Sequence, residues 1–187
     1  MSLSKYGTLN AQRCHVTERI HITSNTKSLI LQPKTRDELR ALIEQELDRQ
    51  GPDVDLNFID TSEITDMSML FHQLDIRNIK IDEWDVSNVT NMAHTFSGCT
   101  EFSCDLSYWD VSNVTNMNGM FINCKVFEGT GLNNWNVPNV KRMNSTFYGC
   151  TKLNVDLSHW DVSKVLDNSF VFHHCYISDD YKPQFKN

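Results

Sequence analysis

The sequence predicts an α/β solenoid of stacked repeats, each made of a short strand, a turn and a short helix. The nine residues 84–92 read WDVSNVTNM and return unchanged at residues 109–117 and with changes at residues 135–143 and 160–168. All four tryptophans lie in these copies, at spacings of 25, 26 and 25 residues. A fixed period of this length is typical of solenoids, because one unit buries its apolar face only against its neighbours.

The copy at residues 106–124 carries the expected local structure. Trp109 and Val111 alternate with polar neighbours, which is typical of a short strand with these two side chains turned inward. Ser112 and the asparagine after it favour a turn. Beyond the turn, apolar residues follow at steps of three, four and three, which is one face of a helix. They are Val114, Met117, Phe121 and Cys124.

Residues 1–54 are expected to form an N-terminal segment and a capping helix. Residues 20–22 and 28–31 favour short strands, and Pro33 closes the second. Thr35 and Glu38 have the spacing of a capping box, and Gly51 with the next proline ends the helix. This helix would cover the open apolar end of the first repeat, with partner binding as the alternative. Its apolar face is Leu39, Leu42, Ile43 and Leu47.

The repeats are expected over residues 55–175, followed by a C-terminal cap at residues 176–187. Residues 55–74 are an atypical first copy, because Met67 and Phe71 lie 25 residues before Met92 and Phe96. The period stops after Cys175, and apolar residues are expected to fold back over the last repeat. These are Tyr176, Ile177, Tyr181 and Phe185.

Composition excludes several function classes. A net charge of −7 supplies no basic stripe for nucleic acid, although it permits a cationic partner. No run of about 18 apolar residues occurs, so we expect no membrane span. No apolar stretch typical of a secretory signal follows residues 1–5. No phosphate-binding loop or hydrolase motif occurs, and His173, His174 and Cys175 form the only run of three adjacent His/Cys residues. We therefore expect no catalysis and no cofactor.

Four of the six cysteines share the repeat period, and none forms a C-x-x-C pair. A buried, reduced ladder is the favoured interpretation, with disulfides or a metal as alternatives. Cys14, His15 and His21 match no ligand spacing and are interpreted as part of the capping segment. The ladder cysteines are Cys99, Cys124, Cys150 and Cys175.

Outward residues beside the tryptophans form two columns that are candidates for partner binding. The first differs between copies while its surroundings repeat, as expected of positions that packing does not dictate, and such columns line the binding surfaces of solenoids. Exposed tyrosine is enriched at binding hot spots, so Tyr108 is the candidate anchor. The first column is Glu83, Tyr108, Asn134 and His159; the second is Asp85, Asp110, Asn136 and Asp161.

The second column places like charges one repeat apart, which requires compensation. Either each carboxylate accepts hydrogen bonds from turn amides, or the column binds Ca²⁺ or a Lys/Arg-rich partner. The tryptophans are expected in the core beside valine and leucine, and an outward sugar-stacking platform is the alternative.

The repeated nonamer, followed by F-x-x-C and D-L-S-x-W-D-V-S, resembles the 25-residue repeat of bacterial surface proteins and lipoproteins first described in mycoplasmas. That family is allied to the BspA-like leucine-rich repeat proteins, and the resemblance covers about residues 56–175. It implies a right-handed leucine-rich-repeat-like solenoid at the cell surface, with binding or adhesive roles and no catalytic residues. We therefore expect a non-catalytic module that binds a macromolecule, a protein first of all, through the strand face. A carbohydrate-binding array and a structural spacer without a ligand are the alternatives.

Overall fold

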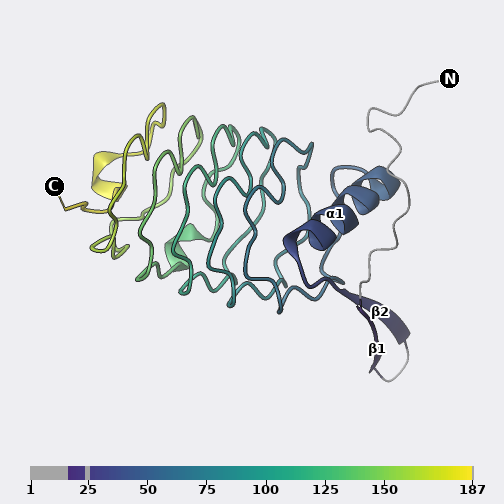
Figure 1. Ribbon diagram of the computed structural model, residues 1–187. Helices are drawn as coiled ribbons and strands as arrows, with labels where there is room; N and C mark the ends of the chain where they lie inside the picture. The colour runs from purple at the N-terminus through teal and green to yellow at the C-terminus, as the bar shows by residue number, and fades with distance from the viewer. Residues whose placement is uncertain (1–16, 24–25, 187) are drawn as a thin grey trace.

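The computed structural model describes residues 17–23 and 26–186, with side chains described from residue 31 on. Two strands pair in antiparallel fashion at the N-terminal end, which confirms the strands predicted at residues 20–22 and 28–31. Leu31 also forms a parallel bridge with Ile59, so the pair is tied to the repeats (Figure 1). The elements are β1 (Thr17–Thr23), β2 (Thr26–Gln32), α1 (Arg36–Gln50) and the 3-10 helices η1 (Leu132–Asn134) and η2 (Asp179–Tyr181).

The capping helix begins and ends as its sequence predicts. Thr35 is the N-cap, and its Oγ1 accepts a hydrogen bond from Glu38 N at 3.2 Å. The Glu38 carboxylate reaches back one residue further than predicted, accepting from Lys34 N at 2.7 Å. Gly51 ends α1 with φ 86°, and its N–H donates to Leu47 O at 2.8 Å.

Helix α1 packs against the first repeat through one face. Leu39 and Ile43 are fully buried there. Arg40 Nη1 donates to Met69 O at 3.0 Å and to Leu70 O at 2.8 Å. Figure 1 shows α1 at one end of the repeats and the yellow C-terminal residues at the other. The helix therefore occupies the position expected of an N-terminal cap.

The predicted right-handed, leucine-rich-repeat-like α/β solenoid is wrong. Within the described chain, residues 55–175 contain no strand and no α-helix, and η1 is their only regular element. Turns make up the repeats, and neighbouring repeats pair through isolated parallel bridges. These bridges include Asp66–Asn91, Asn91–Asn116, Asn116–Arg142 and Arg142–Asp167.

The predicted helix at residues 114–124 is absent because its amides bond elsewhere. Met117 N donates to Arg142 O and Phe121 N to Thr146 O, both at 2.9 Å, whereas an α-helix would need these amides internally. Between them, Gly119 N also donates to the next repeat, at Asn144 O, and Met120 N closes a turn to Met117 O. Gly119 and Asn123 have φ values of 60° and 57°, a left-handed conformation that interrupts a helix.

The predicted strand at residues 106–111 is also a turn. Trp109 N donates to Leu106 O at 3.2 Å, and Val114 N donates to Val111 O at 3.0 Å. The predicted alternation of burial is nevertheless confirmed: Trp109 and Val111 are 3% and 1% exposed, whereas Tyr108 is 81% exposed. The inward positions were thus predictable although their backbone conformation was not.

A stack of parallel phenylalanine rings runs through the core of the repeats. Neighbouring centroids lie 5.2 to 5.6 Å apart, with interplanar angles of 3° to 9°. One ring comes from each repeat, so the stack holds equivalent positions in register. Its members are Phe71, Phe96, Phe121, Phe147 and Phe172.

Polar side chains join each repeat to the one before it. Trp109 Nε1 donates to Ile81 O at 3.0 Å, and Cys124 Sγ donates to Phe96 O at 3.2 Å. Asn113, predicted to form the turn, donates from Nδ2 to Ser87 O at 2.8 Å. The four ladder cysteines are free, and three of them are buried as predicted, whereas Cys175 is half-buried.

The C-terminal residues cover part of the last repeat. Ile177 is buried, Phe185 is half-buried against the core, and Tyr181 O accepts from Leu157 N at 2.8 Å. Tyr176 is 84% exposed, contrary to the expectation that it folds inward. Among the described residues, no helix has the length and apolar character needed to cross a membrane.

Candidate macromolecule-binding face

The eight candidate residues all lie on the surface, immediately before or after a buried tryptophan position. We call this set the tryptophan-turn face. Every member is exposed, and Tyr108 is the most prominent apolar side chain among them at 81% exposure. The face consists of Glu83, Asp85, Tyr108, Asp110, Asn134, Asn136, His159 and Asp161.

The buried tryptophans bring these residues into columns. Each indole Nε1 donates to a backbone carbonyl of the preceding repeat, at 2.9 to 3.1 Å. The Trp135 and Trp160 rings also stack, with centroids 6.2 Å apart and an interplanar angle of 9°. Because each indole is held in the same way, the residues beside it recur at equivalent places from one repeat to the next.

Turn amides compensate the carboxylates of the second column. The Oδ1 atoms of Asp85, Asp110 and Asp161 each accept from the backbone N–H two residues later, at 3.0 Å. The Ser112 side chain, and then its backbone amide, lower the pKa of Asp110. Ser163 lowers the pKa of Asp161 in the same way. These hydrogen bonds therefore stabilise the three carboxylates locally.

The calcium alternative has no support among the described residues, where no group of three or more His, Cys, Asp or Glu side chains could hold a metal ion. The sugar-stacking alternative loses its basis as well. The four indoles are 2% to 4% exposed, so they present no ring face to a sugar. The tryptophans belong to the core, as expected.

An open pocket extends the face onto the first repeat. Its volume is about 270 Å³. Glu83 N donates to Asn57 Oδ1 at 3.2 Å, and Thr61 Oγ1 donates to Asp85 O at 2.9 Å. The pocket is thus formed where two successive repeats meet. Its lining is Asn57, Phe58, Ile59, Asp60, Thr61, Glu83 and Asp85.

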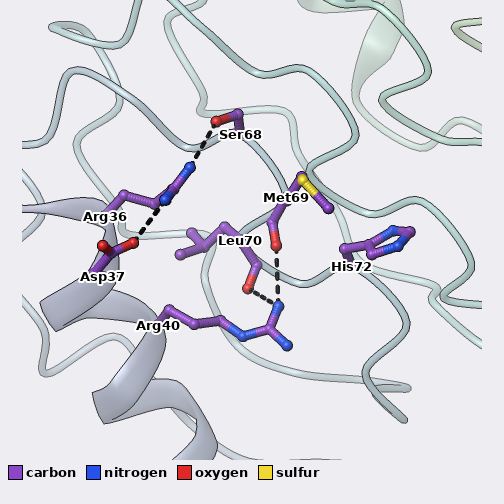
Figure 2. A pocket seen from close by; sticks show the side chains of 7 residues that line it. All are labelled: Arg36, Asp37, Arg40, Ser68, Met69, Leu70 and His72. Atoms are coloured by element: carbon purple, nitrogen blue, oxygen red, sulfur yellow. Dashed lines mark hydrogen bonds and ion pairs between the residues drawn. The ribbon is translucent and has the colours of Figure 1, made fainter.

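A second pocket, which the sequence did not predict, lies between α1 and the first repeat. It encloses about 240 Å³, and Figure 2 shows its lining side chains: Arg36, Asp37, Arg40, Ser68, Met69, Leu70 and His72. The protein itself engages both guanidinium groups. Arg36 binds Asp37 Oδ1 at 2.7 Å and Ser68 Oγ at 3.3 Å, while Arg40 binds the two carbonyls described above. Arg36 and Arg40 are four residues apart on α1, and this spacing is the feature of the sequence that could have indicated the pocket.

Exposed apolar side chains gather at the last repeat. Leu166, Phe170 and Tyr176 are 86%, 63% and 84% exposed. The signal was present in the sequence, because Leu166 and Phe170 stand where the preceding repeat has Lys141 and Ser145. Sequence reasoning placed no binding role there.

Comparison with known proteins identifies a family. The family described as "Mycoplasma protein of unknown function, DUF285" matches residues 45–133 and again residues 105–181. No curated protein and no solved structure matches the chain. Since the two matches together run from residue 45 to residue 181, most of the chain is covered. The chain therefore belongs to this family of Mycoplasma proteins of unknown function.

Proposed function

We propose that this chain is a non-catalytic binding module that recognises another macromolecule, a protein, through the tryptophan-turn face. The observation that carries the proposal is the contrast between scaffold and surface. Buried tryptophans hold the backbone in equivalent positions, while the exposed residue before each one differs: Glu83, Tyr108, Asn134 and His159. Such a surface offers different chemistry at regular intervals on a rigid support.

The chemistry of the face favours a protein partner with basic groups. Tyr108 supplies a large, exposed ring with a polar tip, the type of side chain enriched at interface hot spots. The same face carries the exposed carboxylates of Glu83, Asp85, Asp110 and Asp161. Their negative charge would steer a cationic partner and help to select it.

A role in adhesion at the bacterial cell surface belongs to the same proposal. Its support is the resemblance of the repeated nonamer to repeats of bacterial surface proteins allied to the BspA-like family. An exposed, regular face with no metal cluster among the described residues is compatible with direct protein contact. The compartment itself can be tested by labelling intact cells with an impermeant amine reagent.

The test is a pull-down from host and bacterial extracts with the wild-type chain and the Tyr108→Ala/His159→Ala double variant. The matched control is Tyr176→Ala, because Tyr176 is 84% exposed but lies outside the tryptophan-turn face. Circular dichroism checks that every variant is folded. A protein captured by wild type and Tyr176→Ala, but lost with the double variant, supports the proposal.

Two other outcomes contradict it. If the double variant captures the same proteins as wild type, the tryptophan-turn face is not the binding site. If wild type captures nothing from either extract, the structural spacer becomes the better interpretation.

A further inference from the structure

Cys175 is the last member of the cysteine ladder and the only one that solvent reaches. Cys99, Cys124 and Cys150 are buried under the repeats that follow them, whereas Cys175 is half-buried. Tyr176, the next residue, is exposed, so the C-terminal residues do not seal this end of the ladder. Among the ladder cysteines, Cys175 is therefore the one that a dissolved reagent can reach.

The geometry pairs Cys175 with Cys150. Cys150 Sγ contacts Phe121 O at 2.9 Å, and Cys175 Sγ contacts Phe147 O at 2.6 Å, so the two thiols occupy equivalent sites in successive repeats. The rings of Phe147 and Phe172 report the spacing of those repeats, with parallel planes and centroids 5.6 Å apart. The backbones next to the two cysteines are hydrogen-bonded neighbours, because Gly149 N donates to His173 O at 2.9 Å. Backbones paired in this way lie roughly 5 Å apart, and disulfides join residues whose Cα atoms are roughly 4.4–6.8 Å apart. Each of the two cysteine side chains also shifts the pKa of the other.

The electrostatic environment distinguishes the two thiols. Cys175 has its pKa lowered, first by the hydrogen bond from Cys150 and further by the charge of Lys182. The pKa of Cys150 is raised by the same hydrogen bond and by burial. Lys182 is held nearby, with Nζ 5.8 Å from the centroid of the Phe172 ring. Cys175 is therefore the nucleophile of the pair, and Cys150 is the thiol that responds to it.

We propose that the Cys150–Cys175 pair is a modification site at which a hydroperoxide oxidises the two thiols to a disulfide. In the first step the Cys175 thiolate attacks the distal peroxide oxygen, the O–O bond breaks, and a sulfenic acid and an alcohol form. In the second step Cys150 sulfur attacks the sulfenyl sulfur, and the S–O bond breaks. The Cys150 proton leaves with the hydroxyl group as water. Overall, two thiols and one hydroperoxide react to give one disulfide, one alcohol and one water molecule.

The other ladder cysteines serve as internal controls. Cys99 and Cys124 have the same repeat-to-repeat arrangement, with Sγ contacts to Phe71 O at 2.9 Å and Phe96 O at 3.2 Å. Both are buried, and burial raises the pKa of Cys99 to about 12. Because peroxide in solution cannot reach Cys99 and Cys124, these two thiols should stay reduced although they are arranged like the Cys150–Cys175 pair. The modification is thus confined to the C-terminal end, and it is independent of the proposed binding function.

The experiment treats the folded full chain with hydrogen peroxide, then blocks free thiols with iodoacetamide under denaturing, non-reducing conditions before trypsin digestion. The expected product is a peptide of residues 143–152 linked to one of residues 165–186, lighter than the sum of the two by two hydrogens. The single tryptic peptide of residues 81–125, which contains both Cys99 and Cys124, should carry an alkyl group on each of these cysteines. Reduction before alkylation should abolish the linked species.

Two variants make the result decisive. Cys150→Ser should halt at the sulfenic acid of Cys175, which dimedone traps, and Lys182→Ala should slow the first step. If Cys150→Ser fails to fold, Cys175→Ser still tests the site: its hydroxyl keeps a donor for Phe147 O, and the linked peptide should disappear. Oxidation of Cys175 beyond the sulfenic acid without any linked peptide overturns the proposal. Linkage of either cysteine to Cys104, or no reaction at Cys175, overturns it as well.

Discussion

The ring of Phe121 lies parallel to the ring of Phe147, with their centroids 5.5 Å apart and an angle of 3° between the planes. Phe96 stacks on the other side of Phe121 at the same separation, so Phe121 has a ring on each face. Trp135 also contacts it, at a centroid distance of 6.4 Å. This ring is the centre of the packing between repeats.

Phe121→Ala should lower the free energy of unfolding by about 3–5 kcal/mol, because it removes a fully buried ring and leaves a cavity inside the stack. Urea titration followed by tryptophan fluorescence measures the change. Phe170→Ala is the matched control, since Phe170 is 63% exposed, and its effect should stay within about 0.5 kcal/mol. Equal effects of the two changes would refute a central role for the stack.

Trp109→Phe should cost about 1–3 kcal/mol of stability beyond the loss of ring volume. The change removes the Nε1 donor and leaves the buried Ile81 O without this hydrogen bond. Trp109→Ala should cost about 3–5 kcal/mol, because it also empties the site. Thermal melting of both variants beside Tyr108→Ala, which alters an exposed ring, provides the comparison. A Trp109→Ala protein with the wild-type melting temperature would contradict the buried position.

Asp110→Asn should remove a contribution to stability that depends on pH. The Ser112 hydrogen bonds lower the folded-state pKa of Asp110 below its ordinary value of 3.8, so the contribution is complete above that value. It is lost as the pH falls from 3.8 through the lowered folded-state pKa. The difference between wild type and Asp110→Asn in urea midpoint should therefore be present at neutral pH and vanish at strongly acidic pH. The turn tolerates this change, since Asn136 occupies the equivalent position. A difference that grows on acidification would show that the sign is wrong.

Arg40→Met should loosen α1 from the first repeat. The methionine keeps much of the apolar stem but cannot donate to Met69 O and Leu70 O, and hydrogen bonds from charged groups contribute about 1.5–3 kcal/mol. Amide hydrogen exchange in α1 should become faster than in wild type. Arg49→Met is the control, because within the described part of the chain Arg49 bonds inside the helix, to Glu46 Oε2. Unchanged exchange in Arg40→Met would mean that apolar contacts alone hold the helix.

Gly131→Ala should destabilise the protein more than Gly51→Ala does, by more than about 1 kcal/mol. The two glycines have φ values of 91° and 86°, so the backbone strain of an alanine is nearly the same at both. A Cβ at Gly131 would overlap the backbone of Leu106 and Ser107, whereas a Cβ at Gly51 meets no atom within 4 Å. The difference between the urea midpoints of the two variants therefore measures the destabilisation caused by the steric overlap at Gly131, where two repeats approach closely. Similar midpoints would show that the backbone can move apart.

Burial could be predicted from the sequence, because packing repeats with the period of the chain. The inward positions of Trp109, Val111 and Phe121 follow from apolar spacing, and all are buried. The capping box at Thr35 predicted the start of α1 because its hydrogen bonds are local. Exposure of Tyr108 followed in the same way from its place between inward neighbours.

The backbone conformation could not be predicted, because apolar spacing does not say where amides bond. Steps of three, four and three residues fit a helix, and they equally fit successive turns with left-handed residues at Gly119 and Asn123. The turns are stable here because Met117 N and Phe121 N find acceptors in the next repeat, about 25 residues away. The pocket beside α1 was missed for a related reason: Arg40 faces carbonyls about 30 residues distant in sequence.

The indole and thiol donors that join the repeats point toward the N-terminus. The indole of Trp135, the thiol of Cys150 and the hydroxyl of Thr146 each reach a carbonyl 29 residues earlier. For these contacts, a chain that emerges from the ribosome presents the acceptor carbonyl before the donor side chain, so each indole and thiol can bond as soon as its repeat appears. Shortening from the C-terminal end would leave the remaining indole and thiol donors paired. Removing the first repeat would leave the indole of Trp84 and the thiol of Cys99 without their acceptor carbonyls. The two ends of the repeats therefore differ in what their removal does to these donors.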